Sequence, residues 1–184
     1  MRHPSLLDRE DTTLVVLDLQ EPFLRFIFER DRVVANSVTL IKAAAILGLP
    51  VVSTLQYPER MGDMVPEVLE ALPRGERIGK TTFSACGAEA FARRLEEIGR
   101  KTILVCGVES HICVSQTAHD LLAEGYGVHV AADAVSSRTE ANWKIGLDKM
   151  ARAGAVITSV EAALYEMLVD SKADEFRQIL ELVK

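Results

Sequence analysis

Asp18 is the first residue along the chain whose type and position indicate chemistry. It lies near the end of the apolar run TLVVLDL, where a carboxylate is costly unless it is paired with a cation or used in a reaction. Such a carboxylate can accept a proton, or it can cap the turn that follows the run. The sequence around Asp18 leaves both roles open.

Cys113 follows a short turn after the apolar run TILVCG and lies in the first turn of a helix expected to begin near Ile112. The unpaired amides and the macrodipole at a helix amino terminus stabilise a thiolate, which is the nucleophilic form of cysteine. Cys113 is therefore a candidate nucleophile, and the alternative is a small apolar filler. Cys106, inside the run itself, fits the filler role. The three cysteines form no CxxC pair, so neither a disulfide framework nor a structural zinc site is indicated.

A nucleophilic thiol needs a base, and none of the four histidines is well placed to be one. His111 is nearest to Cys113, but side chains two residues apart on a helix point to different faces, so a turn or surface role suits His111 better. Asp18 is therefore the candidate proton acceptor. Lys80, in ERIGKTTFSACG, has the residue type of a solvated surface side chain. A cation near both Cys113 and Asp18 would nevertheless favour the thiolate and hold the carboxylate in place.

The elements that must position these residues follow from the hydrophobic pattern. Continuous apolar runs of strand length are typical of a parallel sheet that is buried on both faces. They occupy residues 13–19, 50–55, 102–106, 128–132 and 155–158. Helical periodicity occupies residues 31–47, 88–98, 112–123 and 140–153, each followed closely by a glycine that can end a helix. This alternation predicts an α/β fold: a three-layer, doubly wound, Rossmann-like sheet of about six parallel strands in the order 3-2-1-4-5-6, with helices on both faces.

In such a sheet the first and fourth strands are neighbours, and the binding crevice forms at the carboxyl ends of the strands. Asp18 and Cys113 follow these two strands, so the topology predicts that they approach each other. Residues 56–79 are rich in turn formers and are expected to form an active-site loop region with a short helix. The S-x-x-E spacing of Ser137 and Glu140 predicts a capping box at the next helix. Residues 172–184 have the pattern of a surface helix on the sheet or on a partner subunit.

Composition narrows the class of protein. The 184 residues are 48% apolar, which fits one compact domain over residues 1–184. The formal net charge is -6 and no basic block is present, so we expect no nucleic-acid partner. The first residues have no signal-peptide pattern and no run approaches 18 apolar residues, so we expect a cytoplasmic protein without a membrane partner.

Three ordered motifs, LVVLDLQEPF, GKTTFSACG and GVESHICVSQTAHDLLAEGYGVHVAADAVSSR, together resemble the isochorismatase-like cysteine hydrolases. This superfamily includes nicotinamidases, N-carbamoylsarcosine amidohydrolase and isochorismatase, and the similarity runs from about residue 11 to about residue 170. The family's catalytic Asp, Lys and Cys match Asp18, Lys80 and Cys113. The resemblance also implies a cis peptide bond before Glu109, whose amide would form an oxyanion hole with the amide of Cys113.

The chemistry that the resemblance implies is amide hydrolysis through a thioester, with Asp18 as the acid and base and with no cofactor. Nicotinamidases in this family carry an Asp and two His residues that hold a metal after the second strand. The corresponding stretch here, STLQYPERMGDM, has no histidine, and Asp63 alone is poor evidence of a transition-metal site, so no metal is expected. Isochorismatase itself cleaves a vinyl ether without the nucleophilic cysteine, and Cys113 argues against that chemistry.

Within the superfamily, TLQYPERMG and ADAVSSR look closest to the uncharacterised isochorismatase-domain-containing proteins. Phe23, Gln56, Tyr57 and Ile112 lie beside catalytic motifs and are candidates for lining the substrate pocket, with ordinary loop packing as the alternative. The resemblance therefore implies a hydrolase of a small amide or related acyl C–N compound. Members of the family commonly form dimers, tetramers or larger assemblies, so the resemblance also implies a homo-oligomer, with which the apolar tail helix is compatible. The alternatives are an isochorismatase-type vinyl-ether hydrolase and a non-catalytic binding or assembly module that keeps the fold.

Overall fold

The computed structural model describes residues 2–75 and 77–184. Within this part of the chain, six parallel strands form one sheet in the order β3-β2-β1-β4-β5-β6, which confirms the predicted fold class. The strands are β1 (Thr12–Leu17), β2 (Val51–Gln56), β3 (Ile78–Lys80), β4 (Thr102–Val108), β5 (Gly127–Ser136) and β6 (Val156–Thr158). β1 lies at the centre between β2 and β4, so the residues after β1 and β4 are neighbours.

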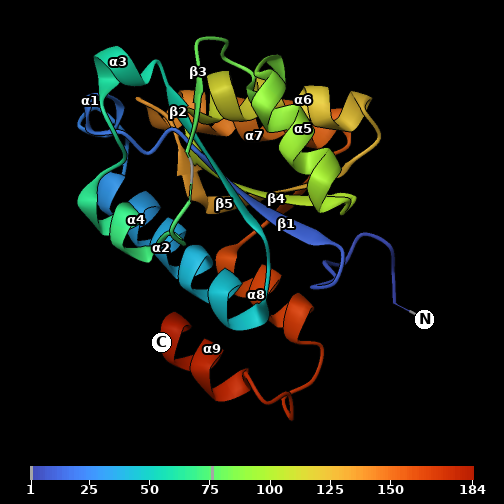
Figure 1. Cartoon of the computed structure of the whole chain (residues 1–184). Coiled ribbons are helices and arrows are strands. Elements are labelled where there is room, and N and C mark those ends of the chain that lie inside the picture. Colours follow the sequence, from blue (N-terminus) through green and yellow to red (C-terminus); the bar gives the residue numbers. More distant parts are fainter. Residues whose placement is uncertain (1, 76) are drawn as a thin grey trace.

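Helices cover both faces of the sheet, which gives the three layers seen in Figure 1. One layer holds α5 (Glu89–Ile98), α6 (Ser115–Ala123) and α7 (Glu140–Ala153). The other layer holds α2 (Arg30–Leu47), α4 (Pro66–Ala71), α8 (Val160–Leu168) and α9 (Phe176–Val183), and α9 packs against α2 and α8 as an outermost helix. The predicted carboxyl-terminal helix therefore lies on the helix layer and not on the sheet. No helix of residues 2–75 and 77–184 is long and apolar enough to cross a membrane.

The core consists of two apolar clusters, one on each face of the sheet. Successive side chains of a strand point to opposite faces. Accordingly, Leu14 and Val16 of β1 belong to the cluster under α2 and α8, whereas Val15 and Leu17 belong to the cluster under α5, α6 and α7. All four side chains are fully buried. This arrangement explains why the strand sequences are continuous apolar runs.

Two local expectations were wrong. The amino-terminal cap of α7 is Thr139, whose hydroxyl accepts a hydrogen bond from the amide of Asn142, so Ser137 and Glu140 do not form a capping box. The hydroxyl of Ser137 is used elsewhere, in contacts with the turn after β4. In addition, residues 56–75 and 77–79, the described part of this stretch, contain two short helices, not one. They are α3 (Pro58–Met61) and α4, and each has a proline in its first turn, where a missing N–H costs nothing.

Candidate active site

Asp18 lies directly after β1, at the carboxyl edge of the sheet. Its backbone φ of 54° is in the left-handed region, and its side chain is buried. The neighbouring strand β2 holds it twice: the Asp18 amide donates to the main-chain oxygen of Thr54 at 3.2 Å, and the Thr54 hydroxyl donates to Oδ1 of Asp18 at 2.7 Å. Asp18 is thus a fixed carboxylate at the predicted switch point, and its side chain does not cap a turn.

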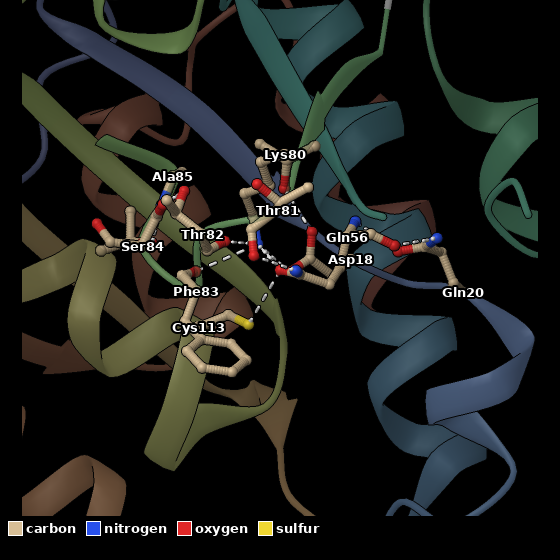
Figure 2. Close-up of polar contacts among 12 residues, drawn as sticks. Asp18, Gln20, Gln56, Lys80, Thr81, Thr82, Phe83, Ser84, Ala85 and Cys113 are labelled. Atoms are coloured by element: carbon tan, nitrogen blue, oxygen red, sulfur yellow. Dashed lines mark hydrogen bonds and ion pairs between the residues drawn. The ribbon is translucent and has the colours of Figure 1, made fainter. Parts of the chain in front are cut away.

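Lys80 is the last residue of β3, and its ammonium group meets Asp18 in the interior. Nζ lies 2.7 Å from Oδ2 of Asp18, and the two side chains are 0% and 2% exposed. Nζ also donates to Oε1 of Gln56 at 2.6 Å and to the main-chain oxygens of Thr82 and Phe83 at 3.3 and 3.2 Å (Figure 2). Lys80 is therefore a buried, paired lysine, and the surface role expected from its residue type alone does not apply.

Gln56, the last residue of β2, links the lysine to the cysteine. Its Nε2 donates to the main-chain oxygen of Thr81 at 2.8 Å, which leaves Oε1 facing Nζ of Lys80 and 3.9 Å from Sγ of Cys113 (Figure 2). The main chain of Gln56 is held by the buried side chain of Gln20, which accepts from its N–H at 2.8 Å and donates to its oxygen at 3.1 Å. Sequence reasoning missed Gln20 and Thr54. Their one signal is that each is a polar residue beside the carboxyl end of a buried strand.

Cys113 lies in a π-helical turn, Ser110–Val114, between β4 and α6. The peptide bond between Val108 and Glu109 is cis, and the main-chain oxygen of Glu109 accepts hydrogen bonds from the amides of Ile112 and Val114 at 3.0 and 3.2 Å. The turn therefore folds back on Glu109. This geometry places Cys113 at the same edge of the sheet as Asp18.

The turn that carries Cys113 is tied to β5 and α7. The hydroxyl of Ser137 lies 2.6 Å from the hydroxyl of Ser110 and 2.9 Å from Nδ1 of His111. Gly146 of α7 packs so closely that an added Cβ would lie 2.7 Å from the carbonyl carbon of Ser110. His111 thus has the turn role expected from its spacing, and it helps to fix the backbone around the cysteine.

The electrostatic environment of Cys113 differs from the expectation. Burial, together with the negative charge of Asp18, raises the pKa of the thiol to about 12, although the positive charge of Lys80 opposes this change. Hydrogen bonding with Asp18 raises the pKa further, and a hydrogen bond from the backbone of Glu109 lowers it. Cys113 does lie in the first turn of a helical segment, because the π-helical turn Ser110–Val114 continues directly into α6, but the expected thiolate is wrong: burial outweighs the local dipoles. Cys113 is a thiol at neutral pH, with a carboxylate beside it that can take its proton.

This raised pKa predicts how Cys113 responds to pH. Because iodoacetamide reacts with the thiolate and the pKa is about 12, the labelling rate of Cys113 should rise about tenfold per pH unit between pH 7 and pH 10 without levelling off. Peptide mass spectrometry would measure labelling at Cys113 separately from Cys86 and Cys106. A free cysteine in a short peptide, with a pKa of about 8.5, is the control that levels off. A labelling rate at Cys113 that reaches a plateau below pH 9 would contradict a thiol pKa of about 12.

A pocket of about 250 Å³ opens beside the thiol. Its polar wall contains Asp18, Gln56, Glu109, Cys113 and Arg138, and its apolar wall contains Pro22, Phe23, Phe26, Phe83, Val108 and Ile112. Of the four residues predicted to line the pocket, Phe23, Gln56 and Ile112 do so. Tyr57 does not: it is the cap residue just before α3, with a φ of 44°, and its ring packs against the guanidinium of Arg60.

A larger cavity of about 620 Å³ lies between the first residues of β2 and α5. Asp18, Lys80 and Cys113 do not line this cavity, so the smaller pocket is the one beside the reactive groups.

Among the described residues, no group of three or more His, Cys, Asp or Glu side chains is arranged to hold a metal ion. The groups present are suited to nucleophilic attack and to proton transfer.

Comparison with known proteins places this arrangement in a family. Residues 12–162 match the isochorismatase domain. The chain is 40% identical over 178 residues to the "Secreted isochorismatase effector Isc1" of Phytophthora sojae, with 94% of this chain and 84% of that protein covered. It is 34% identical over 178 residues to "Isochorismatase domain-containing protein 2" of Danio rerio, with 96% and 89% covered.

Solved structures agree with the sequence comparison. The "MAR1 Ribonuclease" structure from Caenorhabditis elegans is 35% identical, with a TM-score of 0.91 over 97% of this chain and 92% of that chain. The YcaC structure from Escherichia coli, described as an octameric hydrolase of unknown specificity, is 25% identical, with a TM-score of 0.92 over 99% and 91%. The chain belongs to the isochorismatase domain family.

Proposed function

We propose that this chain is a metal-independent cysteine hydrolase that acts on a small amide or a related acyl C–N compound. The observation that carries the proposal is the meeting of a buried thiol, a buried carboxylate and a buried ammonium group beside one small apolar pocket. Cys113 is the proposed nucleophile, Asp18 the acid and base, and Lys80 the cation that holds the Asp18 carboxylate in place.

The first half of the reaction forms a thioester. As Sγ of Cys113 attacks the substrate carbonyl carbon, the thiol proton passes to the Asp18 carboxylate and an S–C bond forms. The carbonyl oxygen then carries the negative charge, and the backbone amides of Glu109 and Cys113 are the proposed donors to it. When the carbonyl reforms, the C–N bond breaks and Asp18 returns its proton to the leaving amine.

The second half releases the acid. Asp18 takes a proton from a water molecule while the water oxygen attacks the thioester carbon, and the C–S bond breaks as the carbonyl reforms. The thiolate of Cys113 recovers the proton from Asp18, which restores the resting thiol. The net reaction is amide plus water to acid plus amine. Its proton transfers use only Cys113 and Asp18, and no step calls for a cofactor.

The pocket wall supports a small substrate with an apolar part. Phe23, Phe26, Phe83 and Ile112 offer apolar surface beside the thiol. The name of the Caenorhabditis elegans structure describes that protein as a ribonuclease. In this chain, however, Arg138 is the one cation among the described residues that line the pocket, and it is already paired with Glu109 at 3.1 Å. The chain also has a net charge of -6. These features favour an acyl compound over a phosphodiester, so we propose a small-molecule substrate and no nucleic-acid partner.

We also propose that the chain forms a homo-oligomer. The octameric state described for the YcaC structure supports this proposal. Exposed aromatic side chains at the pocket support it as well, because Phe26 and Phe83 are 59% and 56% exposed. Light scattering of the purified chain measures the number of copies directly, and a monomer at all concentrations would contradict the proposal.

Covalent trapping tests the proposed reaction. Wild-type protein is mixed with p-nitrophenyl acetate, a small activated acyl donor, and intact and peptide mass spectra locate the acetyl group. We expect acetylation at Cys113 and a burst of nitrophenolate, neither of which should occur in Cys113→Ala. A screen of small amides, ureas and carbamoyl compounds against wild type and Cys113→Ser then identifies the substrate class. Wild-type protein that is not acylated at Cys113 would support the non-catalytic binding module, whereas turnover of isochorismate alone would support the vinyl-ether hydrolase.

A further inference from the structure

We infer that Thr54 is a positioning residue for proton transfer: its hydroxyl sets the orientation of the Asp18 carboxylate relative to the thiol of Cys113. This inference rests on the proposed function, because it assigns a role in the step that Asp18 performs. It adds to the three proposed catalytic side chains a residue that is not among those lining the pocket beside the thiol.

The backbone explains why Asp18 needs an external support. Asp18 lies one residue beyond β1 with a φ of 54°, so the direction of its side chain is not set by regular strand geometry. Thr54 lies within β2, where it is paired in register with Leu17 and is fully buried. Its main-chain oxygen and its hydroxyl both bond to Asp18, at 3.2 and 2.7 Å. The neighbouring strand thus fixes both the main chain and the side chain of Asp18.

The two oxygens of the carboxylate have different donors. Lys80 donates to Oδ2 and Thr54 donates to Oδ1, each at 2.7 Å. The terminal torsion of an aspartate is broad, so a single donor would leave the carboxylate free to rotate about its last bond. Two donors on different oxygens define the plane of the group. Because each carboxylate oxygen has two acceptor positions, both oxygens keep a free position for the thiol proton.

The same sheet contains a matched threonine that has no such contact. Thr13 lies on β1, is also fully buried, and its hydroxyl has no hydrogen-bond partner among the residues that the structure describes. Replacing either threonine with valine exchanges one hydroxyl for one methyl group at a buried strand position. Thr13→Val is therefore the control for the steric and folding effects of this exchange, since only Thr54→Val also removes a contact with Asp18.

The test measures the acylation of Cys113 by p-nitrophenyl acetate in single-turnover experiments on wild type, Thr54→Val, Thr54→Ser and Thr13→Val. In Thr54→Val we expect the limiting rate to fall roughly 10- to 100-fold, because a displaced catalytic group slows the reaction by such factors, while the half-saturating concentration stays unchanged. Thr54→Ser keeps the hydroxyl and should stay within about threefold of wild type, as should Thr13→Val. If Thr54→Val is not recovered folded, Thr54→Cys replaces it, because a thiol is only a weak donor.

Each outcome separates the inference from the proposed function. A limiting rate in Thr54→Val close to that of wild type would overturn the positioning role and leave the proposed reaction standing. An equal loss in Thr54→Ser or in Thr13→Val would also overturn it, because the loss would then come from packing and not from the hydroxyl. Wild-type protein that shows no acylation at Cys113 would overturn the proposed function, and the role of Thr54 with it.

Discussion

Replacing Asp18 with asparagine should make the thiol of Cys113 more acidic while it stops amide hydrolysis. The charge of Asp18 and its hydrogen bond both raise the pKa of Cys113, and the charge of Lys80 lowers it. With asparagine the contribution of the negative charge disappears and that of Lys80 remains, so the pKa of Cys113 falls below about 12 and more thiolate is present at pH 8. Hydrolysis should nevertheless fall roughly 10²- to 10⁴-fold, because no group remains to take and return the proton.

Two measurements on the same variant check this result. Iodoacetamide labelling of Cys113 at pH 8 should be faster in Asp18→Asn than in wild type, since a lower pKa gives a larger thiolate fraction. Turnover of the substrate found in the screen should be lost. Asp63→Asn, which removes a half-exposed carboxylate 2.7 Å from Arg77, is the control in which both quantities stay unchanged. Retained turnover would show that Asp18 is not the base, and slower labelling would show that the site had collapsed.

The fold was largely predictable because its strands are buried on both faces. The runs around Val15 and Val105 have no polar alternation, and only a sheet covered by helices on both sides buries such runs completely. The edge strand β3 could not be predicted with the same rule. It has three residues, Ile78–Lys80, and two of them are a glycine and a lysine, so no hydrophobic pattern marks it.

The part of the candidate site that depends only on strand order was predictable. The contacts among side chains from three different strands were not. Asp18 and Cys113 follow adjacent strands, so their approach follows from strand order alone. Lys80 was assigned only through the family resemblance, because an isolated lysine in a sequence is most often a surface residue. Thr54 was not considered, since its partner Asp18 is 36 residues away in sequence and only the β1–β2 register brings them together.

The raised pKa of Cys113 shows why the expectation of a thiolate at a helix amino terminus failed. The rule that a helix amino terminus favours a thiolate treats the cysteine as exposed and treats the helix as its main neighbour. In the structure the cysteine is buried next to a carboxylate, and both features favour the neutral thiol. The residues next to Cys113 in the sequence predict neither the burial of its thiol nor its distance from Asp18. In the proposed reaction, the proton therefore leaves the thiol during the attack and not beforehand.

Replacing Lys80 with methionine should cost more stability than any surface charge substitution in this chain. The Asp18 carboxylate would stay buried without its cation, and breaking a buried pair by removing one partner costs about 3–5 kcal/mol. Lys144→Met is the matched control: its Nζ also lies 2.7 Å from a carboxylate, that of Glu140, but the lysine side chain is 65% exposed. We expect a loss of at most about 0.5 kcal/mol there, because exposed helix pairs contribute little.

The double variant Asp18→Asn/Lys80→Met decides whether the unpaired charge is the cause. It removes both ions from the interior, so it should recover much of the free energy of unfolding that Lys80→Met loses, while it stays inactive. Urea unfolding of wild type, the two single variants and the double variant at one pH gives the coupling energy. If Lys80→Met is not recovered folded, the double variant should still be. A Lys80→Met protein as stable as Lys144→Met, or a double variant less stable than Lys80→Met, would mean that the buried ion pair does not hold the site together.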